Sequence, residues 1–318
     1  MKNKIISCFI LFVFLFLSCS SVFATNVTIN TDSSNETIDS EKSILELVER
    51  NVCEINLNDM GNFKKELTSE TKEVVRKCEE KGIKIILTSG RSRLITMEYK
   101  NEVGANDYII SSNGADVFNS KTEEKIYSNS ISKECLLKLY DFAKSNKYKL
   151  AFNFDTKLVA NLTYHKQKFC EIKSDNEIMD IIDNKEIVQC VISHYDLEKM
   201  KYFKSIFDSE FEGLQITNQC EKLRNPLGPT RRDYYCDINR RGVSKGIAVK
   251  KMYEYLNISK EETGAIGDSN NDIAMMKEVG LPIAVENATE DLKKVVKYIT
   301  VSNDENGVAK FLRTLIEH

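Results

Sequence analysis

From Glu49 onward, apolar runs of strand length alternate with segments of helical periodicity. Val52–Leu57 and Ile83–Leu87 are two such runs, each long enough for one buried strand. Between them, Thr68 or Ser69 can cap a helix that Gly82 ends. The pattern therefore predicts a strand, a helix and a second strand in succession.

The alternation continues beyond the second apolar run. Ser92–Val103 has helical spacing and is followed by Gly104, and Tyr108–Ile110 predicts another short strand. Few residues separate these elements, which is typical of right-handed βαβ units. We therefore expect a parallel sheet.

The same pattern returns near the C-terminus. The expected helices and strands there are Gly242–Leu256, Thr263–Gly267, Ile273–Val279, Leu281–Val285, Tyr298–Thr300 and a last helix through Leu315. Asn287, with Glu290 three residues later, has the spacing of a capping box, so another helix is expected to begin at Asn287.

The region between these two parts has a different character. Strand-like and helical pieces mix there without any loop of phosphate-binding type, and Asn225–Pro229 holds two of the three prolines. The fold class expected is α/β, with a Rossmann-like parallel-sheet core that is split in sequence by an inserted α/β domain. The expected divisions are a signal peptide over 1–24, a flexible leader over 25–48, core over 49–117, inserted domain over 118–221 and core over 222–318.

The N-terminus has the pattern of a targeting segment. Lys2 and Lys4 precede the apolar run Ile5–Leu17, and Val22–Ala24 has the small-residue pattern at which signal peptidase cleaves. The run is shorter than the ~20 residues of a spanning helix. A cleaved signal and a place in the secretory pathway are the favoured interpretation; an uncleaved anchor and a lipidated Cys19 are the alternatives.

Composition narrows the functional classes. The net charge of −3, with both signs mixed along the chain, argues against a nucleic-acid partner. No C-x-x-C or H-E-x-x-H occurs, and the three histidines are scattered, so a zinc site has little support. Seven cysteines follow the expected cleavage site, an odd number that does not resemble a disulfide framework: Cys53, Cys78, Cys135, Cys170, Cys190, Cys220 and Cys236.

The most informative motif is Gly267-Asp268-Ser269-Asn270-Asn271-Asp272. It follows an apolar strand and opens a helix, which places it at the carboxyl edge of the sheet, where ligands of open α/β sheets bind. Two neighbouring carboxylates suit Mg²⁺, although a capped polar turn would have the same composition. A calcium loop is excluded because Ile273 stands where that loop needs glycine.

Three further loops have weaker patterns. Thr88–Arg91 ends a strand and begins a helix, where free N–H groups can hold a phosphate. Ser111–Ala115 by itself indicates only a turn. Lys245 lies in the first turn of a helix, where the dipole disfavours a cation and so hints at a neighbouring anion. Taken singly, each loop is explained as well by an ordinary turn or surface lysine.

In this order the four loops, Thr88–Arg91, Ser112–Ala115, Gly242–Gly246 and Gly267–Asp272, resemble the motifs of the haloacid dehalogenase (HAD) superfamily, in its Cof-type sugar phosphatases of cap class IIB. The resemblance extends from Val52 to the end of the chain, and the gap before Lys245 matches the position of that family's α/β cap. It implies a Mg²⁺ cofactor and small phosphorylated substrates.

The resemblance also assigns roles to residues. Asp268 and Asp272 correspond to the metal site, Ser89, Gly90 and Lys245 to the phosphate site, and Asn113, Gly114 and Asn271 to the substrate side.

The first motif of the family departs from the pattern. Where the family has D-x-D-G-T after its first strand, this chain has Asn56-Leu57-Asn58-Asp59-Met60. Asn56 then stands at the nucleophile and Asn58 at the general acid and base. A carboxamide can perform neither task near neutral pH. Asp59 is a doubtful substitute, because on a strand it points to the opposite face.

Three functional hypotheses follow. The first is a secreted, catalytically impaired phosphatase that retains a cleft for phosphate and a weakened Mg²⁺ site, and acts by binding a phosphorylated molecule or a protein partner. The second is an active Mg²⁺-dependent phosphatase of small sugar phosphates. The third is a structural or interaction protein with a vestigial cleft. Metal binding separates the first two from the third, and turnover separates the first from the second.

Overall fold

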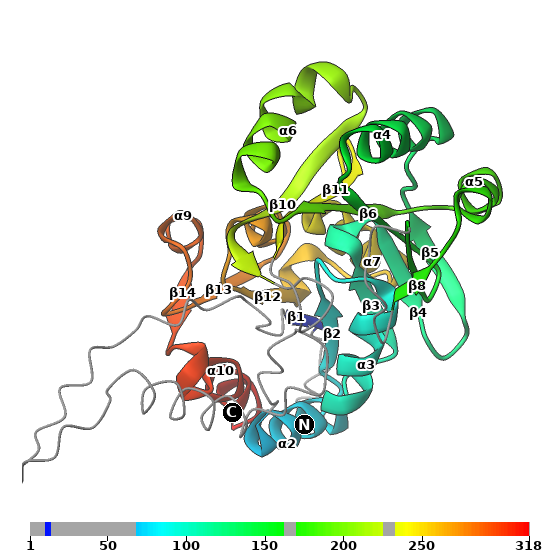
Figure 1. The fold of residues 1–318 in the computed structure, drawn as a ribbon. Helices are drawn as coiled ribbons and strands as arrows, with labels where there is room; N and C mark the ends of the chain where they lie inside the picture. The colour runs from blue at the N-terminus through cyan, green and yellow to red at the C-terminus, as the bar shows by residue number, and fades with distance from the viewer. Residues whose placement is uncertain (1–9, 14–67, 162–169, 225–232, 318) are drawn as a thin grey trace, which may run out of the picture.

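The structure, a computed structural model, describes residues 10–13, 68–161, 170–224 and 233–317. Within these ranges the chain forms two sheets, one in a core and one in a smaller domain that stands on it (Figure 1). The α/β architecture predicted from the sequence, a parallel-sheet core interrupted by an inserted α/β unit, is confirmed.

The core sheet has eight strands. Their order across the sheet is β14 (Tyr298–Thr300), β13 (Leu281–Val285), β12 (Thr263–Gly267), β1 (Ile10–Val13), β2 (Lys84–Thr88), β3 (Tyr108–Ser111), β4 (Asp116–Asn119) and β5 (Glu124–Ser128). The six from β14 to β3 pair in parallel, and β4 and β5 add an antiparallel ribbon. The carboxyl ends of the six parallel strands therefore share one edge.

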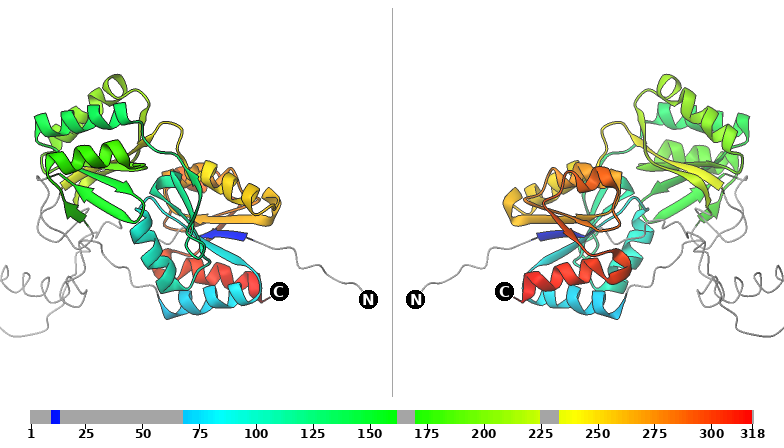
Figure 2. Two further views of the ribbon diagram at one scale, coloured as in Figure 1. Left: turned by 90° about the vertical axis from the view of Figure 1, so that its right-hand side faces the viewer. Right: turned by 90° about the vertical axis from the view of Figure 1, so that its left-hand side faces the viewer.

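Helices cover both faces of this sheet (Figure 2). The core helices are α2 (Ser69–Glu80), α3 (Arg93–Val103), α7 (Lys245–Tyr255), α8 (Ile273–Met276), α9 (Glu290–Lys293) and α10 (Gly307–Ile316). Helices α2 and α10 pack together below the sheet, with α3 beside α2, and α7 packs with α8 above it. Short 3-10 turns are η1 (Ser112–Gly114), η2 (Lys260–Glu262), η3 (Asn270–Asp272) and η4 (Asn303–Glu305).

Most predicted helix ends are present. Thr68 caps α2, because its hydroxyl accepts a hydrogen bond from the N–H of Thr71 at 3.2 Å. Gly82 and Gly104 follow α2 and α3 with φ of 84° and 73°. These left-handed conformations end a helix at little cost only in glycine.

The prediction that Asn287 begins a helix is wrong. The hydroxyl of Thr289 accepts from Leu292 N–H and caps α9, whereas Asn287 Oδ1 accepts from Asn303 N–H at 3.0 Å. Helix α8 is also shorter than the predicted Ile273–Val279, and ends at Met276. The capping-box spacing of Asn287 and Glu290 therefore does not mark the start of a helix, because the Asn287 side chain bonds Asn303 instead.

The inserted domain has a six-stranded sheet. Its order is β10 (Leu214–Arg224), β11 (Asp233–Arg240), β9 (Gln189–His194), β6 (Lys149–Phe154), β7 (Lys157–Ala160) and β8 (Cys170–Ile172). Helices α4 (Lys133–Asn146), α5 (Asp175–Asn184) and α6 (Leu197–Glu210) bury their apolar sides on one face of it. The opposite face points toward the core. We call this domain the cap.

Both expected boundaries of the inserted domain, 118 and 221, need correction. Strands β4 and β5 continue the core sheet, so the cap begins after Ser128. Strand β11 pairs with β9 and β10, so the cap extends to Arg240. Alternating strand patterns look alike in both sheets, and only the pairing partners distinguish them.

The central place in the core sheet belongs to β1, from the predicted signal peptide. Ile10 pairs in parallel with Thr263 of β12 on one side and with Lys84 of β2 on the other. The strand predicted at Val52–Leu57 lies outside the described residues, as do Asn56, Asn58 and Asp59. A strand that is buried on both faces of a sheet is normally a continuous apolar run. The N-terminal segment is such a run, which explains why it can take this place.

In the described parts of the chain no helix is long and apolar enough to cross a membrane. Five of the seven cysteines have described side chains without a disulfide: Cys78, Cys135, Cys170, Cys190 and Cys236. Burial raises the pKa of the Cys78 thiol to about 11, which keeps it protonated and unreactive.

Candidate functional site

The predicted site residues meet at the carboxyl edge of the core sheet, below the cap. Ser89 follows β2, Asn113 follows β3, and Asp268 follows β12. Lys245 comes from the first turn of α7, which packs against the turn η1. Four segments that are distant in sequence thus converge, as expected for the ends of parallel strands.

An ion pair between Lys245 and Asp272 lies at the centre of the site. Lys245 Nζ donates to Asp272 Oδ1 at 2.6 Å, and both side chains are fully buried. The other carboxylate oxygen, Oδ2, accepts from the backbone N–H groups of Asp268 and Ser269, each at 3.1 Å. Asp272 therefore holds both the lysine and the loop, and its two oxygens are engaged by protein donors.

Asp268 lies directly after β12 and is 6% exposed. Its backbone is held on both sides, because its N–H donates to Asp272 and its carbonyl accepts from Thr289 N–H at 2.9 Å. These two hydrogen bonds fix the backbone of Asp268, and therefore the point from which its side chain extends. Of the two acidic residues expected at a metal site, Asp268 is the better candidate, since Asp272 is committed to Lys245.

The loop after β2 has the character of an anion cradle. Ser89 Oγ accepts from Arg91 N–H at 3.1 Å, which leaves the hydroxyl proton for a ligand. Among the described residues, the buried hydroxyls of Thr88, Ser92 and Ser112 have no hydrogen-bond partner. Buried polar groups are normally satisfied, so hydroxyls of this kind at one sheet edge point to a ligand with several acceptors.

The loop after β3 is strained. Ser112, Asn113 and Gly114 have φ of 51°, 59° and 95° in succession, which is costly for the first two. A Cβ on Gly114 would lie 2.3 Å from the carbonyl oxygen of Ser244, next to Lys245. A Cβ on Gly90 would lie 2.7 Å from Asn113 Oδ1. Gly114 is required because backbone of Ser244 lies against it, whereas a side chain at Gly90 would have to displace the Asn113 amide.

Asn113 joins the core loops to the cap. Its Oδ1 accepts from Asn271 Nδ2 at 3.3 Å, and its Nδ2 donates to Thr217 Oγ1 of the cap at 3.0 Å. Two further cap residues reach core backbone: Asn239 donates to Ser112 O at 3.0 Å and Gln189 to Gly90 O at 3.0 Å. The cap is therefore closed over the site by specific polar contacts.

This arrangement matches one family of proteins along most of the chain. The sequence model for haloacid dehalogenase-like hydrolases matches residues 61–312. The chain belongs to this family. The match begins directly after Asn56–Met60, the segment compared above with the family's first motif.

Relatives of this HAD-like protein are phosphatases. It is 24% identical over 280 residues to the phosphatase YwpJ of Bacillus subtilis, covering 80% of this chain and 95% of YwpJ. It is 28% identical over 254 residues to YcsE of the same organism, a 5-amino-6-(5-phospho-D-ribitylamino)uracil phosphatase, covering 78% of this chain and 88% of YcsE. The resemblance proposed from the four loops is thus confirmed at the level of the family.

Solved structures agree with the fold. A haloacid dehalogenase-like hydrolase of Bacteroides thetaiotaomicron superposes with a TM-score of 0.69 at 26% identity, over 79% of this chain and 94% of that one. The subclass IIB sugar phosphatase BT4131 superposes with a TM-score of 0.62 at 21% identity, over 79% and 93% of the two chains.

The described residues supply an incomplete site for the Mg²⁺ that the family resemblance implies. In the described ranges, no three His, Cys, Asp or Glu side chains lie close enough together to hold a metal ion. Asp268 provides one carboxylate, and Asp272 is held by Lys245. Asn56 and Asn58, which the resemblance in sequence puts at the remaining ligand positions, lie outside the described residues and would offer only neutral carbonyl oxygens.

A structural anchor in the HAD-like core escaped the sequence interpretation. Arg93 Nε donates to Asp116 Oδ2 at 2.8 Å, a second guanidinium nitrogen bonds Oδ1, and Ser111 Oγ donates to Oδ2 at 2.7 Å. The Arg93 guanidinium also lies 4.1 Å from the Phe118 ring centroid. This buried pair fixes the start of α3 against β4. No local motif signals it, because the partners are 23 residues apart.

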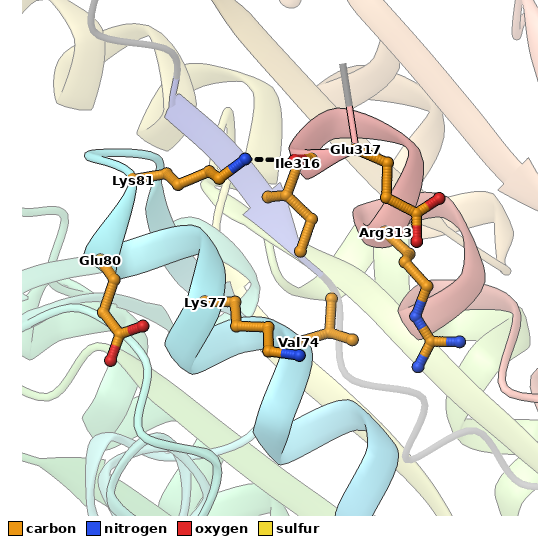
Figure 3. A pocket seen from close by; sticks show the side chains of 7 residues that line it. All are labelled: Val74, Lys77, Glu80, Lys81, Arg313, Ile316 and Glu317. Atoms are coloured by element: carbon orange, nitrogen blue, oxygen red, sulfur yellow. Dashed lines mark hydrogen bonds between the residues drawn. The ribbon is translucent and has the colours of Figure 1, made fainter.

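A surface pocket of about 310 Å³ lies between α2 and α10, away from these loops (Figure 3). Its cations have partners: Lys81 donates to the carbonyl of Ile316, Lys77 pairs with Glu73, and Arg313 pairs with Glu70. We therefore assign the ligand site to the sheet edge and not to this pocket.

Proposed function

We propose that this HAD-like protein binds a phosphorylated small molecule in the cleft between core and cap, and hydrolyses it slowly or not at all. The retained part of the site supports binding. Lys245, Ser89 and the unpartnered hydroxyls at the sheet edge are suited to phosphoryl oxygens. The chain's membership of a family whose relatives are phosphatases supports the same ligand class.

One feature of the sequence and the strand order supports the proposed loss of turnover. Neither segment available as the central strand is followed by the carboxylates of the family. Val13 of β1 pairs with Ile266, two residues before Asp268, and the next eight residues, 14–21, contain no acidic side chain. The strand predicted at Val52–Leu57 puts Asn56 and Asn58 at the required positions and directs Asp59 to the opposite face. Both arrangements therefore favour a site without a well-placed nucleophile.

The chemistry explains why the asparagines matter. In-line attack on phosphorus requires an anionic oxygen, and the leaving group requires a proton. The amide oxygen of Asn56 is a weak nucleophile, and Asn58 does not titrate near neutral pH. The loss of one member of a catalytic unit commonly lowers kcat by several orders of magnitude.

The deciding experiment is phosphate release from a panel of sugar phosphates with Mg²⁺, for the native protein and for Asn56→Asp/Asn58→Asp. We expect no release by the native protein, and release by the double variant that Asp268→Asn abolishes. Binding of a substrate to the native protein, measured by calorimetry, completes the proposal. Turnover by the native protein that disappears with Asp268→Asn would overturn the impaired activity.

An active phosphatase is the second candidate, because the relatives that match over nearly their full length are phosphatases. Asp59 is the carboxylate nearest to the required positions. Native turnover that is lost in Asp59→Asn and kept in Asn58→Ala would establish this alternative. YcsE acts on a phosphorylated ribityl compound, so sugar and sugar-alcohol phosphates belong in the panel.

Export through the secretory pathway is part of the proposal and rests on the sequence pattern of residues 1–24. In the structure, β1 comes from the same segment and pairs with β12 and β2. An uncleaved N-terminus would therefore serve as a strand of the core sheet. N-terminal sequencing of the protein from its native source decides between them. A mature N-terminus at Thr25 supports export, and an intact Met1 supports the strand.

A further inference from the structure

The linker that returns from the cap to the core leads directly to Lys245. Strand β11 ends at Arg240 and α7 begins at Lys245, so residues 241–244 join the two domains. Lys245 is the first residue of α7, and its buried ammonium group lies beside Asp272. The place of this lysine therefore depends on where the linker enters the helix.

A glutamine of the cap holds this linker at two successive residues. Gln215 is half-buried on β10; its Oε1 accepts from Gly242 N–H at 2.9 Å, and its Nε2 donates to the carbonyl of Val243 at 2.6 Å. Both partners are backbone groups of fixed polarity, so only this orientation of the amide satisfies both. One side chain thus pairs with the linker much as a neighbouring strand would.

The same linker is packed against both domains. The Val243 side chain is 3% exposed and lies in an apolar cluster with Ala115 of the core and Val188 of the cap. One residue later, the Ser244 carbonyl lies so close to Gly114 that a Cβ there would be 2.3 Å from its oxygen. The linker therefore has little room to move, and a change in how the cap holds Val243 is passed along the chain into α7.

We propose that Gln215 is a positioning residue for Lys245, and that the cap controls the phosphate side of the site through it. This inference rests on the proposed function, in which Lys245 holds phosphoryl oxygens. Gln215 acts on the backbone of the linker, so its effect should appear with every ligand that carries a phosphate. Inorganic phosphate is included, although it has no further part for the cap to recognise.

A purely structural role for Gln215 makes a different prediction. Helix α7 has its own close contact with the core, because a Cβ on Gly246 would lie 2.4 Å from the carbonyl oxygen of Ala274 in α8. If such contacts alone fix Lys245, the loss of the Gln215 amide will lower the stability of the protein and leave its phosphate affinity unchanged. The affinity of the folded protein is therefore the informative measurement.

The test titrates the full-length protein with inorganic phosphate and follows binding by phosphorus NMR, well below the unfolding temperature. Gln215→Met keeps the length of the side chain and removes both hydrogen bonds to the linker. It should weaken phosphate binding about tenfold, because a displaced lysine loses a charge-assisted hydrogen bond. Asn218→Ala is the matched control: it removes an amide of the same strand that bonds Asp237 within the cap, and it should keep the native affinity.

A double-mutant cycle identifies the route of the effect. Lys245→Met/Asp272→Asn removes the lysine without leaving a buried charge. In that background Gln215→Met should change the phosphate affinity by less than about twofold, because the residue through which it acts is gone.

Gln215→Thr keeps the experiment decisive if Gln215→Met fails to fold. Threonine suits a strand and is too short to reach the linker, so the same loss of affinity is expected. An unchanged affinity in the folded variants, or an equal loss with and without Lys245, overturns the role of Gln215. A native protein that binds neither inorganic phosphate nor a sugar phosphate contradicts the proposed function, and this inference with it.

Discussion

Two loops at the centre of the core sheet can be compared directly. The loop after β12 holds Asp268, the Asp272 carboxylate and Lys245 in a closed network of hydrogen bonds. The neighbouring strand β1 is followed in sequence by apolar residues, and its competitor Val52–Leu57 leads to asparagines. The β12 side of the site is held by described contacts, whereas the sequence offers no carboxylate at the expected positions on the other side. Under the proposed function, binding and bond cleavage depend on different strands and can be lost separately.

The largest effect should come from restoring the missing charges. We expect Asn56→Asp/Asn58→Asp to release phosphate from sugar phosphates at least about 10³-fold faster than the native protein, since two members of a catalytic unit return together. Single variants should gain little. The measurement is steady-state phosphate release with Mg²⁺. A double variant that binds ligand and stays inactive would mean that Val52–Leu57 does not take the central place, which β1 holds in the structure, or that the β12 side is damaged as well.

The β12 side of the site can be tested by removing one partner of its buried ion pair, Lys245 and Asp272. Lys245→Met leaves the buried carboxylate of Asp272 without its cation, so the free energy of unfolding should fall by about 3–5 kcal/mol. Urea denaturation at pH 7 measures the change. Lys245→Met/Asp272→Asn keeps an acceptor for the loop N–H groups and should recover more than half of the loss. Equal losses in both variants would contradict this account.

Asp237 of the cap, a carboxyl whose pKa is raised by burial, should make the free energy of unfolding depend on pH. The pKa of Asp237 is about 6 in the fold and 3.8 as its ordinary value, so the folded protein binds the proton more tightly. The contribution of Asp237 to the free energy of unfolding should therefore be full below about pH 4 and be lost as pH rises through 6. In Asp237→Asn this component, about 3 kcal/mol at most, should be absent, which unfolding curves between pH 4 and 7 will reveal.

The smallest effect tests a helix end. Thr289→Ala removes the cap of α9 and should cost about 1 kcal/mol. Asn287→Ala removes one exposed bond to Asn303 and should cost less. Thermal unfolding of both variants at one pH gives the order. The reverse order would restore Asn287 as the cap that its spacing suggested.

Much of the core was accessible from the sequence because local patterns determined it. The strand Thr263–Gly267 was predicted with its observed bounds, since turn residues and a helix frame it. The converging loops followed from the rule that parallel strands end at one edge. The domain boundaries were misjudged because β4 and β11 have similar patterns and differ only in their pairing partners.

The contacts between cap and core were beyond the reach of the sequence. Thr217, Asn239 and Asp237 belong to alternating strands whose polar positions look like ordinary solvated faces. Their importance arises only when the cap sheet is placed over Asn113, more than one hundred residues away in the chain. The ion pair of Arg93 and Asp116 was missed for the same reason.

The pairing of β1 with β12 has a consequence for biosynthesis. Ile10 and Thr263 are neighbours in the sheet, yet nearly the whole chain separates them. Contacts of such long range form late, because loop closure must precede them. While the ribosome is still producing the cap, the N-terminal apolar run has only β2 to pair with, and β12 does not yet exist. We therefore expect that run to stay accessible to targeting factors throughout most of translation, and to be withdrawn from them only when the last fifth of the chain emerges.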